Sequence, residues 1–119
     1  MAELEIAELT EKELGEVESI EKVSQSRPWS EASFRKELHV SFSKILGARR
    51  VSNNRLLGYL VLWQVSDEIH ILNVAVRPDD RRCGVGRQLM QAGFSFGRKC
   101  GAKVVYLEVR GSNDAAISL

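Results

Sequence analysis

The sequence predicts a mixed α/β fold of the α+β kind, with a mostly antiparallel sheet, one parallel βαβ pair and helices on both faces. Two stretches carry this prediction. Residues 42–65 hold two strand-like runs around a polar turn, which predicts an antiparallel hairpin. Residues 68–110 follow the order strand, glycine loop, helix, strand, which predicts two parallel strands joined by a right-handed crossover.

The N-terminal part of the chain predicts one strand and two helices. Residues 3–8 alternate in polarity and suit an edge strand. Thr10 and Glu13 then form a capping box for a helix that reaches about Ser24. Its apolar stripe, Leu14, Val17, Ile20 and Val23, recurs at every third position and therefore drifts around the helix. Ser30 follows an interruption and can cap a second, short helix.

The strand after the hairpin has a slip in its apolar phase. Within residues 68–76, Ile69 and Ile71 share one phase, and Leu72, Val74 and Val76 share the other. A bulge explains this slip, and a strand buried on both faces explains it about as well.

The C-terminal part predicts one long helix and a last strand. Val85 begins a run with helical spacing, and Gly101 is placed to end it. Residues 103–110 read as a strand, and residues 112–119 read as the opening of a further helix.

The composition fits one compact domain. The chain has 119 residues, 44% of them apolar, and we take residues 1–119 as a single domain. With 17 basic and 16 acidic residues, it has no global field that would drive direct binding to nucleic acid or to a membrane. No run approaches the length of a membrane span, and the acidic start lacks the features of a signal peptide, so we expect a cytoplasmic protein.

The cysteines and histidines predict no metal site. Cys83 and Cys100 have no C-x-x-C spacing, and a cytoplasmic location predicts that both are reduced. His39 and His70 are isolated in the sequence, so we expect no bound metal ion.

The loop RRCGVGR at residues 81–87 is the clearest candidate for a binding site. It precedes a helix start, where unpaired N–H groups and a partial positive charge favour an anion. Gly84 and Gly86 leave room for a phosphate oxygen near the backbone, and three arginines add positive charge. The spacing is neither a Walker loop nor a G-x-G-x-x-G fingerprint, and two glycines alone would be better explained as a tight turn.

Several stretches resemble the GNAT superfamily of N-acetyltransferases. RRCGVG matches the superfamily's acetyl-CoA signature, Q/R-x-x-G-x-G/A. The stretches PWS at residues 28–30, NVAVRPDDRRCGVGRQLM at residues 73–90 and LEVRGSNDAAISL at residues 107–119 are similar to the ribosomal-protein-alanine N-acetyltransferase (RimI) branch. The resemblance runs in order from about Ile6 to the last residue.

This resemblance implies acetyl-CoA as a cosubstrate. The strand at Val74, Ala75 and Val76 would pair with the pantetheine arm, although an ordinary core strand explains these residue types equally well. Asn113 matches an asparagine that contacts the cofactor, and an asparagine that caps a following helix is a strong alternative. The pyrophosphate would lie on backbone amides at Arg82, Cys83, Gly84, Val85, Gly86 and Arg87.

The resemblance also makes Glu108 the candidate general base. Alternation along the last strand puts Glu108 on the same face as Val104 and Tyr106, and a carboxylate beside apolar groups suits removal of a proton from an amine. Without the family match, a glutamate that is solvated or paired with Arg110 would be the preferred interpretation. The implied reaction is direct attack of a neutral amine on the acetyl thioester, with the Val76 N–H stabilising the oxyanion.

The sequence departs from the family at its C-terminal end. Relatives continue after a stretch like AAISL with a tyrosine that protonates the departing thiolate and then with further strands, whereas Leu119 is the last residue here. We expect a fragment of a longer protein, a natural truncation, or a domain completed by a segment of another copy. Missing strands would expose an edge beside Glu108, which favours a homodimer or aggregation.

Three functions are open at this point. The resemblance favours a transferase that acetylates the N-terminal α-amine of a protein, with the N-terminal alanine of a small-subunit ribosomal protein as its acceptor. The departure at the C-terminal end leaves an acyl-CoA-binding module or an inactive remnant as the second function. A transferase acting on a small amine or a lysine side chain is the third.

Overall fold

The predicted sheet is present in a computed structural model, which describes residues 3–81 and 83–108 and the backbone of residues 115–118. Within these residues, one sheet contains β1 (Leu4–Glu8), β2 (Ser43–Arg50), β3 (Leu56–Val65), β4 (Glu68–Val76), β5 (Val104–Leu107) and β6 (Ala115–Ser118). The strands lie in the order of the chain, and all neighbours are antiparallel except β4 and β5, which are parallel. The predicted mixed sheet with one parallel pair is therefore confirmed.

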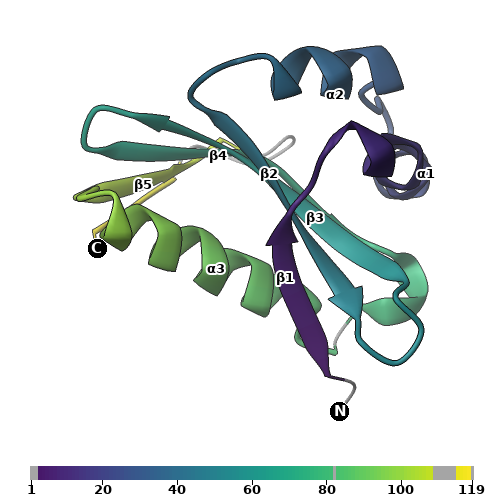
Figure 1. Cartoon of the computed structure of the whole chain (residues 1–119). Coiled ribbons are helices and arrows are strands. Elements are labelled where there is room, and N and C mark those ends of the chain that lie inside the picture. Colours follow the sequence, from purple (N-terminus) through teal and green to yellow (C-terminus); the bar gives the residue numbers. More distant parts are fainter. Residues whose placement is uncertain (1–2, 82, 109–114, 119) are drawn as a thin grey trace.

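Helices cover both faces of the sheet (Figure 1). Helices α1 (Leu14–Ser24) and α2 (Glu31–Leu38) lie on one face, and α3 (Val85–Lys99) lies on the other. Each face has its own apolar core. The core under α1 and α2 includes Leu14, Val17, Ile20, Phe34 and Tyr59. The core under α3 includes Leu60, Leu62, Ile69, Ile71 and Leu89.

Both N-terminal helices begin at the predicted caps. Thr10 and Glu13 make a complete capping box around a short 3-10 turn, Glu11–Glu13, from which α1 continues. At the start of α2, the Ser30 hydroxyl accepts a hydrogen bond from the Ser33 N–H. These contacts satisfy N–H groups that a helix start otherwise leaves without an acceptor.

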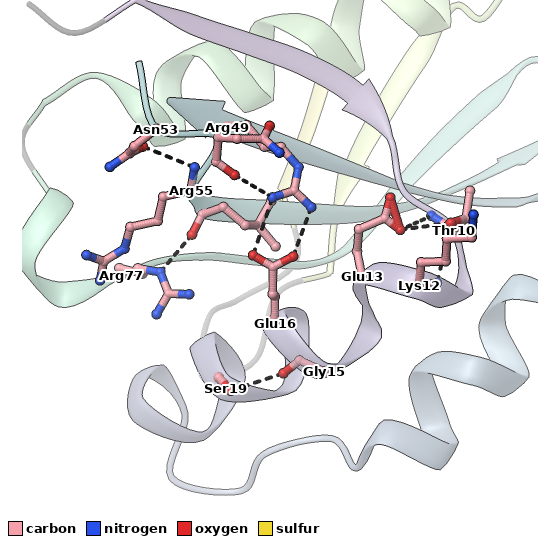
Figure 2. A network of polar contacts seen from close by, with 12 residues as sticks. Thr10, Lys12, Glu13, Gly15, Glu16, Ser19, Arg49, Asn53, Arg55 and Arg77 are labelled. Carbon is pink, nitrogen blue, oxygen red and sulfur yellow. Dashed lines mark hydrogen bonds and ion pairs between the residues drawn. The ribbon is translucent and has the colours of Figure 1, made fainter. Parts of the chain in front are cut away.

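An ion pair ties α1 to the hairpin of β2 and β3 (Figure 2). The Arg49 guanidinium contacts the two carboxylate oxygens of Glu16 at 3.0 and 3.3 Å and donates to the Asn54 carbonyl at 2.9 Å. The hydrogen bond to Glu16 raises the pKa of Arg49 above its usual value, although burial acts in the opposite direction. This contact helps to fix the position of α1 on the sheet.

Strand β4 contains a bulge at Leu72. Val61 of β3 is opposite Asn73, while the next residue of β3 is opposite Ile71, so Leu72 is an extra residue in β4. The bulge reverses the side-chain phase, because Ile71 packs under α3, Leu72 packs under α1 and α2, and Val74 again packs under α3. Of the two explanations for the phase slip in the sequence, the bulge is confirmed.

Strands β4 and β5 separate directly before this bulge. Their parallel pairing ends where Ile71 is opposite Leu107, and the Glu108 N–H adds one more bond, to the Ile71 carbonyl at 2.8 Å. The strand predicted at residues 103–110 is therefore shorter than expected, because β4 turns away from it at the bulge. Glu108 lies just past the end of β5, and residues 109 and 110 lie outside the described residues.

The prediction of a helix opening at residues 112–119 is wrong for the part that the structure describes. Ala115–Ser118 forms β6, which pairs antiparallel with the whole length of β5. Without this pairing, β5 would present a row of N–H and C=O groups with no partner, and β6 satisfies them. The expected exposed edge of β5 is accordingly covered, and β6 is the edge strand of the described sheet on this side.

Replacing Phe34 with alanine should lower the free energy of unfolding by about 3 to 5 kcal/mol. Phe34 is fully buried, and its ring contacts those of Trp29 and Tyr59 at centroid distances of 5.1 and 5.6 Å. The matched control is Phe42→Ala, since Phe42 is 42% exposed and should cost about 1 kcal/mol or less. Urea denaturation of both variants measures the difference, and equal losses would contradict the central position of Phe34 in the core.

Candidate functional site

A buried polar network holds β4 just after its bulge. The fully buried Glu21 carboxylate accepts hydrogen bonds from the Tyr59 hydroxyl and from the Asn73 side-chain amide, the latter at 3.0 Å. Its other oxygen accepts from the Trp29 N–H at 2.9 Å. Gln25 donates to the side-chain carbonyl of Asn73 at 3.3 Å. The residue that follows the bulge is therefore bonded to α1, to β3 and to the segment after α1.

Sequence reasoning did not identify Glu21. It placed Val23 on the apolar stripe of α1, but Val23 is 61% exposed and Glu21 is fully buried. On a helix, positions three and seven residues after Leu14 share its face, so residue 21 lies on the same buried face as Leu14 and Val17. An acidic residue at such a position indicates a buried polar contact, and this signal was present in the sequence.

Beyond the bulge, one edge of β4 has no strand beside it among the described residues. Arg77 donates its N–H to a carbonyl of β3 at 2.8 Å. In an antiparallel strand the N–H and C=O of one residue point to the same side, and the side alternates along the strand. Ala75 therefore faces β3, whereas Val74 and Val76 face the open side. The Arg81 side chain agrees with this direction, because its Nε donates to the Val76 carbonyl at 3.2 Å.

Helix α3 begins without a side-chain cap. Gly84 is its N-cap residue, and the first turn holds no acidic residue. A hydrogen bond runs from the Gln88 N–H to the Gly84 carbonyl, so the N–H groups of Val85, Gly86 and Arg87 have no acceptor within the helix. A helix start of this kind is open to an anion.

The two glycines of the loop are required for different reasons. Gly84 has a φ of 81°, a left-handed conformation that strains other residues. Gly86 is helical, and a Cβ at this position would meet only Val76 Cγ2, at an ordinary contact distance of 3.8 Å. Backbone conformation therefore explains Gly84, whereas neither conformation nor packing within the protein explains Gly86. Close approach of a ligand to the helix start would explain Gly86.

Of the remaining predicted loop residues, Cys83, Val85 and Arg87 lie at this helix start. Val85 is buried in the core under α3, so it offers the site only its backbone. Cys83 and Arg87 are exposed. Arg82 and Asn113 lie outside the described residues.

Two arginines hold the segment between β4 and α3. Arg50 donates to the Asp80 carboxylate at 2.8 Å, and Asp80 is only 8% exposed. The Arg77 side chain donates to the Leu56 carbonyl at 2.7 Å (Figure 2). The sequence by itself predicts solvated loop residues at Arg77, Asp79 and Asp80. Asp79 is exposed as expected, whereas the expectation is wrong for Arg77 and Asp80. Their contacts with β2 and β3 instead fix the segment from which α3 begins.

Glu108 lies where β4 and β5 separate. Its carboxylate contacts His70 Nδ1 at 3.1 Å, and its side chain is 38% exposed. The other ring nitrogen of His70 contacts the Glu68 carboxylate at 2.9 Å. The ring also stacks on Tyr106, with 5.0 Å between the two centroids. The candidate base thus has a histidine partner and access to solvent.

Sequence reasoning treated His70 as an isolated residue. The parallel register of β4 and β5 places His70 opposite Tyr106, and so brings it close to Glu108. The predicted βαβ unit indicates that the strand of His70 lies beside the strand that leads to Glu108. The sequence does not determine the register of these two strands, so it does not predict that the two residues meet. Arg110, the partner considered from the sequence, lies outside the described residues.

Two other features are absent from the part of the chain that the structure describes. It holds no group of three His, Cys, Asp or Glu side chains placed to bind a metal ion. Of its helices, none has the length and apolar character of a membrane span.

Several known proteins with similar sequences are named as acetyltransferases. A model of the acetyltransferase (GNAT) family matches residues 5–119. The ribosomal protein bS18-alanine N-acetyltransferase of Escherichia coli K12 is 32% identical over 114 residues, which are 96% of this chain and 75% of that protein. The N-alpha-acetyltransferase RimI of Mycobacterium tuberculosis is 35% identical over 96 residues, which are 77% of this chain and 58% of that protein.

The fold is also similar to that of a solved acetyltransferase. The crystal structure of the ribosomal-protein-S18-alanine N-acetyltransferase from Escherichia coli has a TM-score of 0.83 and 29% sequence identity, and the match covers 93% of this chain and 70% of that chain. Similarity in sequence and in fold thus extends over nearly the whole chain. With its single parallel strand pair and its glycine loop at a helix start, the chain belongs to the GNAT family of acetyltransferases.

Proposed function

We propose that this protein is an acetyl-CoA-dependent N-acetyltransferase that acetylates the N-terminal α-amine of a protein. Its proposed acceptor is the N-terminal alanine of a small-subunit ribosomal protein. The observation that carries the proposal is the open edge of β4, which leads from Glu108 to the uncapped start of α3. We assign residues 1–119 to a single N-acetyltransferase domain that acts in the cytoplasm, and a second copy could pair with the outer edge of β6.

Acetyl-CoA supplies the acetyl thioester, and the described residues offer a place for a long ligand with an anionic head. The outward backbone groups of Val74 and Val76 would bind the pantetheine arm as they would bind an added strand. The amides of residues 82–87 would bind the pyrophosphate. Ala75 would act as the spacer between the two outward residues, and Asn113 would add a side-chain contact.

Glu108 would take the proton from the acceptor amine. Its carboxylate is partly exposed at the point where the open edge of β4 begins. The Val76 N–H points to the same open side and would donate to the thioester carbonyl, where negative charge develops during attack. Because the amine attacks directly, no side-chain nucleophile is required, and the exposed Cys83 has no covalent role. The C–N bond forms, the C–S bond then breaks, and CoA leaves as a thiolate that takes up a proton from water.

The choice of acceptor rests on the named relatives and on amine chemistry. The relative from Escherichia coli is named for the alanine of ribosomal protein bS18, and the one from Mycobacterium tuberculosis is named as an N-alpha-acetyltransferase. An α-amine has a reference pKa of about 7.7 to 8.0, against about 10.4 for a lysine side chain. Near neutral pH, an α-amine is therefore much easier to deprotonate than a lysine.

A peptide with a free N-terminal alanine should be acetylated by this protein. The same peptide with a blocked N-terminus and an internal lysine should not, because the lysine amine remains protonated near neutral pH. Mass spectrometry after incubation with acetyl-CoA locates the acetyl group. Transfer to the lysine alone would contradict the proposed acceptor class while leaving the transferase activity intact.

Replacing Gly86 with alanine should weaken acetyl-CoA binding by about tenfold or more, because the new methyl group covers amides that would hold the pyrophosphate. The fold should tolerate the change, since the methyl meets only Val76 at 3.8 Å and alanine is favoured in helices. Isothermal titration calorimetry measures the affinity.

The matched control for Gly86→Ala is Gly93→Ala. Gly93 lies on the same helix, and its added methyl would also meet its nearest neighbour at 3.8 Å. The control should therefore bind acetyl-CoA as the unchanged protein does. Equal affinity of the two variants would contradict a pyrophosphate site at the start of α3.

Replacing Glu108 with glutamine should lower kcat by about 10²- to 10⁴-fold, because an amide cannot take the proton. The affinity for acetyl-CoA should not change. Steady-state kinetics and calorimetry separate the two effects. Glu5→Gln is the control, since Glu5 is an exposed residue of β1 at the far edge of the sheet. Normal turnover by the Glu108 variant would show that another residue is the general base.

A further inference from the structure

The ring of His70 links two carboxylates at the point where β4 and β5 separate. His70 Nδ1 lies 3.1 Å from Glu108 Oε2, and Nε2 lies 2.9 Å from Glu68 Oε1. One face of the ring lies on Tyr106, with an angle of 21° between the two planes. These three contacts fix both the position of the ring and its rotation.

The Glu108 side chain gains its orientation from this ring. Its backbone is held by the bond to Ile71, but a 38% exposed glutamate can otherwise adopt several rotamers. Within the described residues, His70 is the side chain that hydrogen-bonds to the Glu108 carboxylate. Because the contact uses Oε2, it leaves Oε1 to face an incoming amine.

Orientation matters because proton transfer depends on geometry. A general base acts when its carboxylate lies within hydrogen-bond reach of the proton that it takes. Misplacement by about 1 Å can lower a rate on the order of 100-fold. A fixed His70 therefore affects the chemical step more than it affects binding of acetyl-CoA.

We propose that His70 is a positioning residue for the general base. Its Nδ1–H donates to Glu108 Oε2 and turns Oε1 toward the acceptor amine, while its Nε2–H donates to Glu68 Oε1 at the other end of the ring. His70 itself neither touches the substrate nor takes part in bond making. The inference rests on the proposed function, because it takes Glu108 as the base.

Three substitutions at His70 separate its contacts. His70→Phe keeps a flat ring against Tyr106 and removes both hydrogen bonds. His70→Asn can place an amide N–H near the position of Nδ1, and so retains a donor for Glu108. His70→Gln reaches instead toward the position of Nε2, and so retains the contact with Glu68. Each variant is compared with the unchanged protein by kinetics and by thermal melting.

We expect kcat to fall in the variants that lose the hydrogen bond to Glu108 and to be largely kept in the variant that retains it. His70→Phe should lower kcat by about 10- to 100-fold, with the KM for acetyl-CoA and the melting temperature nearly unchanged. His70→Asn should restore most of the lost rate, and His70→Gln should not. Wild-type kcat in the Phe variant, or equal losses in the Phe and Asn variants, would overturn the inference.

A double variant tests whether His70 acts through Glu108. If it does, His70→Phe should cause no further loss of rate in a Glu108→Gln background. A further loss there would assign His70 a separate role and overturn the inference. If Glu108→Gln has a lowered kcat and His70→Phe has a normal kcat, this inference is wrong while the proposed function is unaffected. Normal turnover of Glu108→Gln removes the proposed base and the inference together.

Discussion

Strands β4 and β5 lie side by side up to Ile71 and Leu107 and then separate at the bulge of β4. A bulge bends its strand and increases the local twist, which turns β4 away from its parallel neighbour. Among the described residues, this separation leaves the outward backbone groups of Val74 and Val76 without a strand beside them. It also places Glu108 where the gap begins. The candidate site therefore depends on one extra residue, Leu72.

The buried Glu21 network explains why that extra residue stays in place. A buried carboxylate costs several kcal/mol unless hydrogen bonds compensate for its lost hydration, and Asn73 supplies one of these bonds. Moving the bulge past Asn73 would turn that side chain to the other face of the sheet and break the contact. The network thus couples the register of β4 to the position of α1. The shape of the candidate site is then set partly from the opposite face of the sheet.

Local patterns in the sequence predicted most of the fold, because caps, turns and apolar periods act over a few residues. The capping box at Thr10, the cap at Ser30 and the helix end before Gly101, which has a φ of 80°, are examples. Contacts between distant segments could not be predicted in this way. The pairing of His70 with Glu108 needs the register of two strands, and the β6 strand at residues 115–118 depends on the edge that β5 offers.

The start of α3 lacks the features that would stabilise a helix of this length in isolation. A serine or aspartate at the N-cap contributes about 1 kcal/mol relative to alanine but only a few tenths relative to glycine, an acidic first turn adds a few tenths more, and glycine inside a helix costs roughly 1 kcal/mol relative to alanine. Helix α3 has an N-cap glycine without a side-chain bond, no acidic residue in its first turn, and Gly86 inside that turn. Each missing feature would place a side chain or a negative charge where an anion would otherwise meet the backbone amides. Gly84 follows from its left-handed backbone. The lack of an acidic residue in the first turn and the glycine at position 86 are better explained by a ligand at that end than by the fold alone, because Val85 and Leu89 keep the helix packed on the sheet.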